Sequence, residues 1–114
     1  SHPASMRACA ISNVLVNAIE YTPSNGVIHI DMRLNNMQQA EIVIEDSGKG
    51  FSPTDLVEAT TMFYTGDTSR NNRSHHGIGL YSANSILKLH QGGIIIENSD
   101  HLCGAKVTLY FKAS

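Results

Sequence analysis

Apolar residues near the N-terminus recur with the 3.6-residue period of an amphipathic helix. The pattern starts at Ser5 and continues to about Tyr21, and Pro23, Asn25 and Gly26 then end it. Its apolar stripe consists of Met6, Ile11, Val14, Leu15, Ala18 and Ile19. We therefore expect a helix over residues 5–21 that packs one broad face against a core.

Two segments after this helix alternate with the period of two that is typical of strands. From Ile28 to Leu34 every second side chain is apolar, which predicts a half-buried strand over residues 27–34. An Asn-Asn turn follows, and the β-branched run 41–44 predicts an antiparallel neighbour that ends at Asp46.

A second helical pattern opens at Gly77 and ends at Gly92 and Gly93. Its apolar positions are Ile78, Leu80, Ala83, Ile86, Leu87 and Leu89. Beyond it, residues 94–97 and 105–111 predict a hairpin of strands that closes the chain.

The segment between the first pair of strands and the second long helix has a different character. Residues 52–55 (Ser-Pro-Thr-Asp) cap a short helix that we expect to run through about Thr60. Residues 65–76 are polar and show no periodicity, which in a compact domain is typical of a functional lid or a disordered linker. An aromatic cluster around Phe63 can anchor one end of this segment, so we expect a lid over about residues 52–76.

The composition excludes several classes of protein. A chain of 114 residues with a net charge of −2 fits one domain and carries no electrostatic footprint for nucleic acid. No apolar run reaches the roughly 18 residues of a membrane helix. Cys9 and Cys103 form no CxxC pair, and we expect two free thiols in a reducing compartment rather than a disulfide. Because the sequence begins almost inside its first helix, we expect a domain excised from a longer protein.

Two asparagines stand in the first helix, in which Asn is a poor interior residue. Asn13, Asn17 and Tyr21 are spaced four residues apart, so all three share one face. A pair of surface amides would account for the asparagines. The alternative is a row of amide oxygens for a ligand, since one or two oxygen donors completed by phosphate and water suit Mg²⁺.

The second candidate lies where the strand ending at Asp46 becomes a loop. Gly48 and Gly50 lack a Cβ, so backbone N–H groups there can approach a bound group closely. The Asp46 carboxylate can accept a hydrogen bond from an amine donor, such as the exocyclic amino group of adenine. Taken alone, the same residues also fit an ordinary turn.

The glycines at the start of the second long helix are the third candidate. Gly77 and Gly79 leave free N–H groups and a positive dipole end, which suit a phosphate chain. The spacing matches neither a P-loop nor a dinucleotide fingerprint. The adjacent His75 and His76 have no third ligand at a spacing that would favour zinc.

Four motifs in this order resemble the catalytic ATP-binding domain of sensor histidine kinases. That domain belongs to the Bergerat-fold superfamily, which gyrase B and the mismatch-repair ATPases share. Residues 11–22 look like the N box and residues 46–51 like the first glycine box. Residues 62–70 are similar to the F box, and residues 77–80 to the second glycine box. The match runs from about residue 7 to residue 112, and four motifs in the right order are specific although each alone is weak.

The resemblance implies a role for each matched residue. Asn17 would coordinate Mg²⁺, Asn13 would contact phosphate, and Asp46 would bind the adenine amino group, with Arg70 or Arg73 reaching the γ-phosphate. The implied nucleotide-binding residues are Asn13, Asn17, Tyr21, Asp46, Gly48, Gly50, Phe63, Gly77, Ile78, Gly79 and Leu80. The implied catalytic residues are Asn13, Asn17, Arg70 and Arg73.

Two positions depart from the family pattern. Glu20 stands where histidine kinases usually carry Lys or Arg, so one phosphate-binding cation is missing and the side chain is expected to turn to solvent. His75 stands where the second glycine box normally begins, so the lid is expected to hinge differently.

The implied fold is an α/β two-layer sandwich, with a mixed, mainly antiparallel sheet of about five strands under about three helices. The implied reaction is transfer of the γ-phosphate of ATP, with Mg²⁺, to a histidine on a separate dimerisation domain. We expect residues 1–114 to form one cytoplasmic, monomeric domain that binds no nucleic acid and reaches a response regulator only indirectly. A serine kinase of the anti-sigma type and a non-catalytic regulatory nucleotide-binding module are the alternatives.

Overall fold

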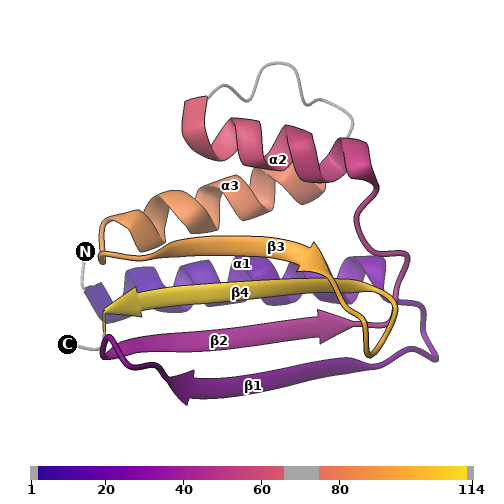
Figure 1. Ribbon diagram of the computed structural model, residues 1–114, viewed down its shortest axis with the longest axis horizontal. Coiled ribbons are helices and arrows are strands. Elements are labelled where there is room, and N and C mark those ends of the chain that lie inside the picture. Colours follow the sequence, from indigo (N-terminus) through magenta and orange to yellow (C-terminus); the bar gives the residue numbers. More distant parts are fainter. Residues whose placement is uncertain (1–2, 66–74, 113–114) are drawn as a thin grey trace.

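The computed structural model describes the backbone of residues 3–65 and 75–112, and within them the side chains of residues 5–60 and 80–112. This part of the chain forms three helices and four strands, and Figure 1 shows how they are arranged. In chain order they are α1 (Pro3–Tyr21), β1 (Ile28–Leu34), β2 (Gln39–Asp46), α2 (Pro53–Thr65), α3 (His75–Lys88), β3 (Gly93–Asn98) and β4 (Ala105–Lys112). The order of helices and strands confirms the prediction from the hydrophobic pattern.

The described strands form one sheet in the order β1-β2-β4-β3, and every neighbouring pair is antiparallel. The predicted sheet had about five strands and was mixed, so the described part differs in both respects. The physical reason lies in β4. The connection through α2 and α3 makes β3 run in the same direction as β2, and β4 inserts between these two strands as an antiparallel neighbour of both (Figure 1).

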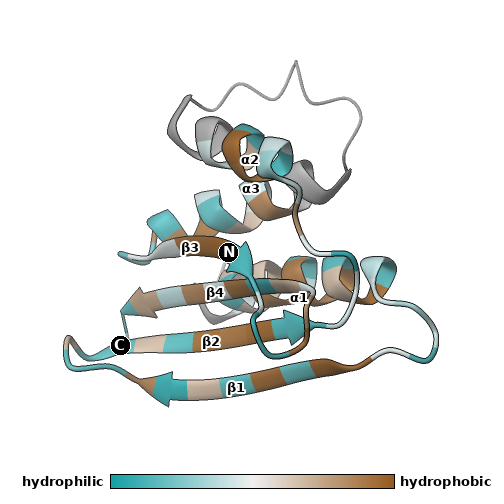
Figure 2. Cartoon of the chain, turned by 45° about the vertical axis from the view of Figure 1, so that its right-hand side comes forward, coloured by the Kyte–Doolittle hydropathy of each residue, from teal (hydrophilic) through white to brown (hydrophobic). Residues whose placement is uncertain are grey.

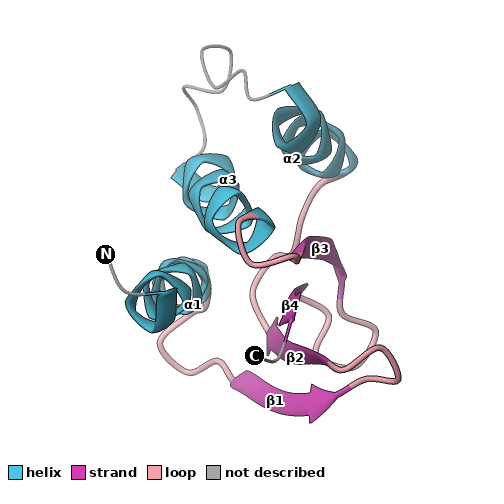
Figure 3. Ribbon diagram, turned by 90° about the vertical axis from the view of Figure 1, so that its left-hand side faces the viewer, coloured by secondary structure: helices cyan, strands magenta, loops and turns pink. Residues whose placement is uncertain are grey.

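The helices cover one face of the sheet, as the two-layer prediction requires. Figure 3 shows α1 and α3 on the same side of the sheet, with α2 beside α3 and beyond the β3 edge. The strand register explains this arrangement, because opposed residues point to the same face. Ile42 lies opposite Leu109, and Leu109 lies opposite Ile94, so the three strands present one apolar surface to the helices.

The core lies between this surface and the inner faces of α1 and α3 (Figure 2). Its buried members include Ala10, Val14, Ala18, Ile42, Ile44, Leu80, Ala83, Leu87, Val107 and Leu109. The predicted apolar stripes of the two long helices supply most of the helical side of this core. Ile19 is an exception, since it is 62% exposed.

Strand β1 was predicted to be half-buried, and this prediction was wrong. Ile30, Met32 and Leu34 lie opposite buried or partly buried residues of β2 and so point to the helical side, yet each is at least 50% exposed. The reason is the position of the strand. β1 forms one edge of the sheet, and the helix layer packs over β2, β4 and β3 instead.

The short helix predicted after Ser52 begins as expected but is longer than predicted. The capping pair is confirmed at the start, where the Asp55 N–H donates to Ser52 Oγ at 3.0 Å and the Ser52 N–H donates to Asp55 Oδ2 at 3.3 Å. The helix then continues past Thr60 to Thr65, because the first glycine after the cap is Gly66. Residues 66–74 of the predicted lid lie outside the described part of the chain.

Helix α3 ends at Lys88 rather than at the glycines. The left-handed residue beyond it is Gln91, with φ 59°, and the Gly92 N–H donates to the Leu87 carbonyl at 2.9 Å. Gly92 serves a different purpose, because a Cβ there would collide with the Tyr110 carbonyl. Among the described helices, none is both long and apolar enough to cross a membrane.

Candidate functional site

The candidate site lies where the C-terminal end of α1 meets the loop after β2. Tyr21 ends α1, and the Thr22 hydroxyl donates to the Ala18 carbonyl at 2.7 Å, which folds the chain back over the last turn. A cleft of about 470 Å³ opens beside this turn. Its lining residues are Glu20, Tyr21, Thr22, Pro23, Gly48 and Lys49. Tyr21 and Gly48, predicted from separate motifs, therefore lie in the same cleft.

Asp46 is the most firmly held polar side chain near this cleft. It is only 4% exposed, and its Oδ1 accepts hydrogen bonds from the Gly48 N–H at 2.9 Å and the Ala105 N–H at 3.0 Å. Both donors bind the same oxygen, and no described residue donates to Oδ2. The carboxylate therefore has a fixed orientation and one oxygen free to accept from a ligand amine.

Glycines allow the backbone to close around Asp46. A Cβ at Gly104 would collide with the main-chain carbonyl and the side chain of Asp46, and a Cβ at Gly48 would collide with the Tyr21 carbonyl. The predicted close approach at Gly48 thus exists, and it brings the loop against the end of α1.

Gly50 has a different role from Gly48, since its φ of 78° belongs to the left-handed region. The turn that it makes delivers Phe51 into the core, where Phe51 is 4% exposed. Asn98 at the end of β3 fixes this residue from both sides. Asn98 Oδ1 accepts from the Phe51 N–H at 2.7 Å, and its Nδ2 donates to the Phe51 carbonyl at 2.9 Å. The loop is therefore bound to β3 as well as to β4.

The start of β1 supports the same loop. The Ser47 N–H donates to the Val27 carbonyl at 3.0 Å, and the Val27 N–H donates to Ser47 Oγ at 2.8 Å. Val27, directly before β1, thus holds residues 46–51 in place together with β3 and β4.

The asparagines of α1 differ in exposure. Asn17 is 6% exposed and Asn13 is half-buried, whereas Tyr21 is 41% exposed. A pair of surface amides therefore does not describe Asn17. Glu20 is exposed at the cleft, as expected for a side chain that turns to solvent.

The remaining predicted site residues lie on or between α2 and α3. Phe63 belongs to α2, and Gly77, Ile78 and Gly79 belong to the start of α3. For these four residues the structure describes the backbone only. Arg70 and Arg73 lie outside the described residues. Helix α3 begins at His75, two residues earlier than predicted, so Gly77 falls within the first turn. N–H groups of that turn have no acceptor within the helix. Leu80 is fully buried in the core.

The sequence did not predict the residues of the β3–β4 turn region that hold Asp46 and Phe51, because they are distant from both along the chain. Asn98 ends β3, Ala105 begins β4 and Gly104 lies in the turn between them, and no local sequence pattern identified these roles. Their roles depend on the antiparallel register between β2 and β4, which places Ala105 beside Asp46 across 59 positions of sequence.

Comparison with known proteins adds independent findings. Residues 8–114 match the family described as histidine kinase-, DNA gyrase B- and HSP90-like ATPases. The sensor histidine kinase SpaK of Bacillus subtilis is 34% identical over 90 residues, which are 79% of this chain and 19% of that protein. The phosphate regulon sensor protein PhoR of Pseudomonas aeruginosa is 34% identical over 90 residues, 78% of this chain and 20% of that protein.

A solved structure supports the same relation. The mycobacterial sensor histidine kinase MprB superimposes with a TM-score of 0.68 at 25% identity, covering 90% of this chain and 69% of that structure. The chain spans only about a fifth of the length of the curated relatives named above.

The fixed orientation of Asp46 can be tested through Gly104. Replacing Gly104→Ala should lower the free energy of unfolding by about 1–3 kcal/mol, because the added methyl group must displace the Asp46 backbone or side chain. Urea denaturation measures this loss, and the exposed turn residue His101→Ala serves as a control that should change stability by less than about 0.5 kcal/mol. In the Gly104 variant the Gly48 and Ala105 amide resonances should also shift. A variant as stable as the parent with unchanged amide shifts would show that this contact does not fix Asp46.

Proposed function

The chain belongs to the family of histidine kinase-, DNA gyrase B- and HSP90-like ATPases, and we propose that it holds ATP for a sensor histidine kinase. In this proposal the γ-phosphate passes to a histidine on a separate dimerisation domain. The observation that carries the proposal is the Asp46 carboxylate, held by two backbone N–H groups with one oxygen free beside the cleft. An amine of adenine is a donor that such an oxygen can recognise.

The proposed base-binding end of the site is rigid. Asp46 would accept from the adenine amino group, and Tyr21 would line the same cleft, with Gly48 leaving room for the base. A fixed acceptor selects between bases because guanine presents a carbonyl oxygen where adenine presents its amino group. Gly50 contributes through the turn that anchors Phe51.

The proposed phosphate end lies toward the start of α3. Gly77 is in the first turn of α3, whose free N–H groups and dipole favour anions, and Ile78 and Gly79 follow it. Arg70 and Arg73 are the proposed cations for the γ-phosphate, and Phe63 is proposed to anchor the segment that carries them. Leu80, which is buried, would support this end from the core.

Mg²⁺ is proposed to bind through Asn17, with Asn13 contacting phosphate. The amide oxygen of Asn17 is a donor of the type that Mg²⁺ accepts, and the described residues contain no cluster of three or more His, Cys, Asp or Glu that could hold a metal ion. A Mg²⁺ ion at Asn17 would therefore take most of its ligands from phosphate and water. When bound, it neutralises the charge of the phosphate chain.

The phosphoacceptor is proposed to come from another domain. None of the six histidines of the sequence stands in the His-Asp/Glu-x-x-x-Pro setting that the resemblance associates with phosphorylation. Phosphoryl transfer requires mainly positioning and charge neutralisation, so one domain can hold the donor while another supplies the nucleophile. The proposed partners are a dimerisation domain of the same protein and, through it, a response regulator. The chain itself would act as a monomer in the cytoplasm, where ATP is available.

The proposed metal site predicts that magnesium strengthens nucleotide binding through one amide. Asn17→Ala should remove most of the difference between the affinities for ATP measured with Mg²⁺ and with a chelator. Isothermal titration of the parent and the variant under both conditions measures this difference. Asn25→Ala, in the exposed turn after α1, is a matched control that should retain it. Equal affinities of the parent protein with and without Mg²⁺ would contradict the assignment of Asn17.

The proposed base contact predicts a loss of selectivity. Asp46→Ala should weaken ATP binding by about 1–3 kcal/mol, since the adenine amino group loses its acceptor in a buried place. Competition between ATP and GTP for a fluorescent nucleotide measures the preference, and circular dichroism confirms that the variant is folded. A variant that still prefers ATP as strongly as the parent would show that Asp46 does not read the base.

The proposed reaction predicts that the chain alone hydrolyses ATP very slowly. Related ATPases that hydrolyse ATP well place a Glu where this chain has Asn13, whose amide cannot accept a proton at neutral pH. With radiolabelled ATP, label should move to an added dimerisation domain and should be lost in acid, as expected of phosphohistidine. Acid-stable label would instead favour a serine kinase, and binding without any transfer would favour a regulatory module. A steady-state ATPase assay that shows fast turnover by the parent chain, lost in Glu20→Gln, would contradict the proposed reaction.

A further inference from the structure

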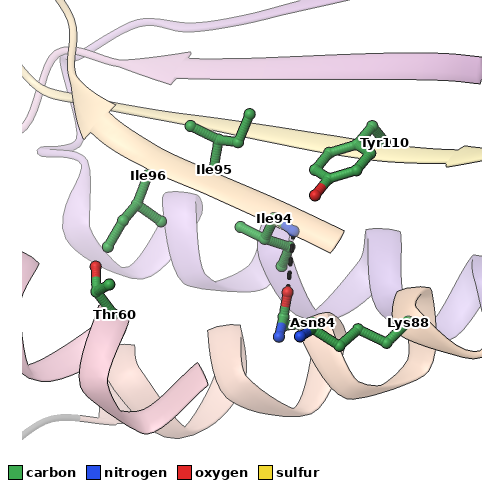
Figure 4. Close-up of a pocket in the computed structure, with 7 residues that line it drawn as sticks. All are labelled: Thr60, Asn84, Lys88, Ile94, Ile95, Ile96 and Tyr110. Carbon is green, nitrogen blue, oxygen red and sulfur yellow. Dashed lines mark hydrogen bonds between the residues drawn. The ribbon is translucent and has the colours of Figure 1, made fainter. Parts of the chain in front are cut away.

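A second cavity, of about 320 Å³, lies on the opposite side of α3 from α1, at the β3 edge of the sheet. Figure 4 shows the side chains that line it, which come from α2, α3, β3 and β4. They are Thr60, Asn84, Lys88, Ile94, Ile95, Ile96 and Tyr110. None of them lines the cleft beside Asp46, so the proposed nucleotide site does not account for this cavity.

Asn84 is the polar residue that defines the cavity. It is only 3% exposed, and its Oδ1 accepts from the Ile94 N–H at 3.0 Å, which fixes the orientation of the amide. The Nδ2 group consequently points away from the strand, and no described residue accepts a hydrogen bond from it. The Nδ2 atom is not itself enclosed by protein, because the one fully buried side-chain atom without a partner among the described residues is His90 Nε2, so Asn84 Nδ2 is open to the cavity and can donate to a ligand that supplies an acceptor.

Lys88 adds a second donor at the same place. It follows Asn84 by one helical turn, and Figure 4 shows its amine beside the Asn84 amide. Among the described residues Lys88 has no ion-pair partner. An amide donor and a cation therefore converge without an acceptor between them, which is an arrangement that favours an anionic oxygen.

The rest of the cavity is apolar with hydroxyl groups at its rim. Ile94 and Ile96 present side chains from the helical side of β3, and Ile95 is 50% exposed beside them. Gly93 lets the Tyr110 hydroxyl approach the same end, since a Cβ at Gly93 would lie 2.9 Å from that hydroxyl and 3.3 Å from Asn84 Oδ1. Asn84, Lys88 and the Tyr110 hydroxyl thus gather at one end of the cavity with Ile94, and Ile96 and Thr60 lie at the other end (Figure 4).

Asn84 also indicates what kind of molecule can enter. β3 is an edge strand, and an edge strand can pair with an added peptide through its outward N–H and carbonyl groups. The Ile94 N–H is already bonded to Asn84, so a peptide strand cannot use it. A compact molecule fits this geometry better than an extended peptide.

We propose that this cavity binds a small amphipathic anion, with a carboxylate on Asn84 Nδ2 and Lys88 Nζ and an apolar body against Ile94 and Ile96. This cavity and the cleft beside Asp46 share no lining residue, so the proposed anion site is separate from that cleft. The site stands on the geometry of Asn84 and Lys88 and is independent of the proposed kinase function.

Decanoate is a suitable probe, because it joins one carboxylate to an apolar chain, and decanol is its uncharged counterpart. Both are titrated below the micelle concentration of decanoate into the ¹⁵N-labelled 114-residue chain, and amide spectra are recorded. Decanoate should shift the Ile94–Ile96 amides and the Asn84 side-chain amide in a saturable manner, whereas decanol should not saturate them.

Two variants separate the proposed contacts from general apolar binding. Lys88→Met keeps the length of the side chain and removes the charge, and it should weaken decanoate binding about tenfold, the loss of one charge-assisted hydrogen bond. Asn84→Asp keeps the acceptor for Ile94 and replaces the N–H₂ donor with a negative oxygen, so binding should be lost. Lys106→Met, on β4 with its ion pair to Glu97, is the matched control and should bind like the parent.

Three outcomes would overturn the proposal. The first is equal binding of decanoate and decanol, and the second is shifts spread over the whole chain. The third is an unchanged affinity in Lys88→Met, which is exposed and should fold normally even if Asn84→Asp does not.

Discussion

The proposed site depends on the two hydrogen bonds that Asp46 Oδ1 accepts from the Gly48 and Ala105 N–H groups. The bond from the Gly48 N–H stabilises the turn at the end of β2, and the bond from the Ala105 N–H joins that turn to the first residue of β4. Because both act on one oxygen, they orient the whole carboxylate, and the second oxygen becomes a directed acceptor. A buried carboxylate without these donors would carry a large desolvation cost, so the same bonds make its burial tolerable. Recognition and stability therefore rest on one local arrangement.

Helix α3 carries residues of both the proposed phosphate end and the cavity at β3. Its start, with Gly77, belongs to the proposed phosphate end of the nucleotide site, and Leu80 anchors that start in the core. Two turns later, Asn84 and Lys88 line the cavity at β3 on the other side. Helix α3 packs against α1, α2 and β3, so both regions rest on one helix.

The sequence predicted those features whose cause lies in neighbouring residues. The periodic apolar stripe defined α1, the capping pair at Ser52 and Asp55 defined the start of α2, and the alternation before Asp46 placed that carboxylate at a strand end. Features caused by distant residues were not predictable in this way. β1 alternates like a half-buried strand but lies at an edge of the sheet that the helices do not cover. Gly92 makes room for the Tyr110 carbonyl, and Gly104 makes room for the Asp46 backbone, and both partners are distant in sequence. The sequence gives no sign that Asn84 differs from other polar residues of the helix, because its role depends on the hydrogen bond from the Ile94 N–H of β3.

The charges at the cleft explain why the described residues alone cannot complete the proposed reaction. Its lining contains one cation, Lys49, and one anion, Glu20, so it offers no net positive charge to a triphosphate. Asp46, just beside it, adds a further carboxylate on the base side. Phosphoryl transfer needs the charge on the phosphate oxygens to be neutralised as the bond to the leaving group breaks. In the proposed reaction, a bound Mg²⁺, the N–H groups at the start of α3 and the arginines at 70 and 73 would supply that neutralisation. In this proposal the chain would orient the base through fixed contacts but take its nucleophile from another domain, so ATP would stay intact until the partner histidine arrives.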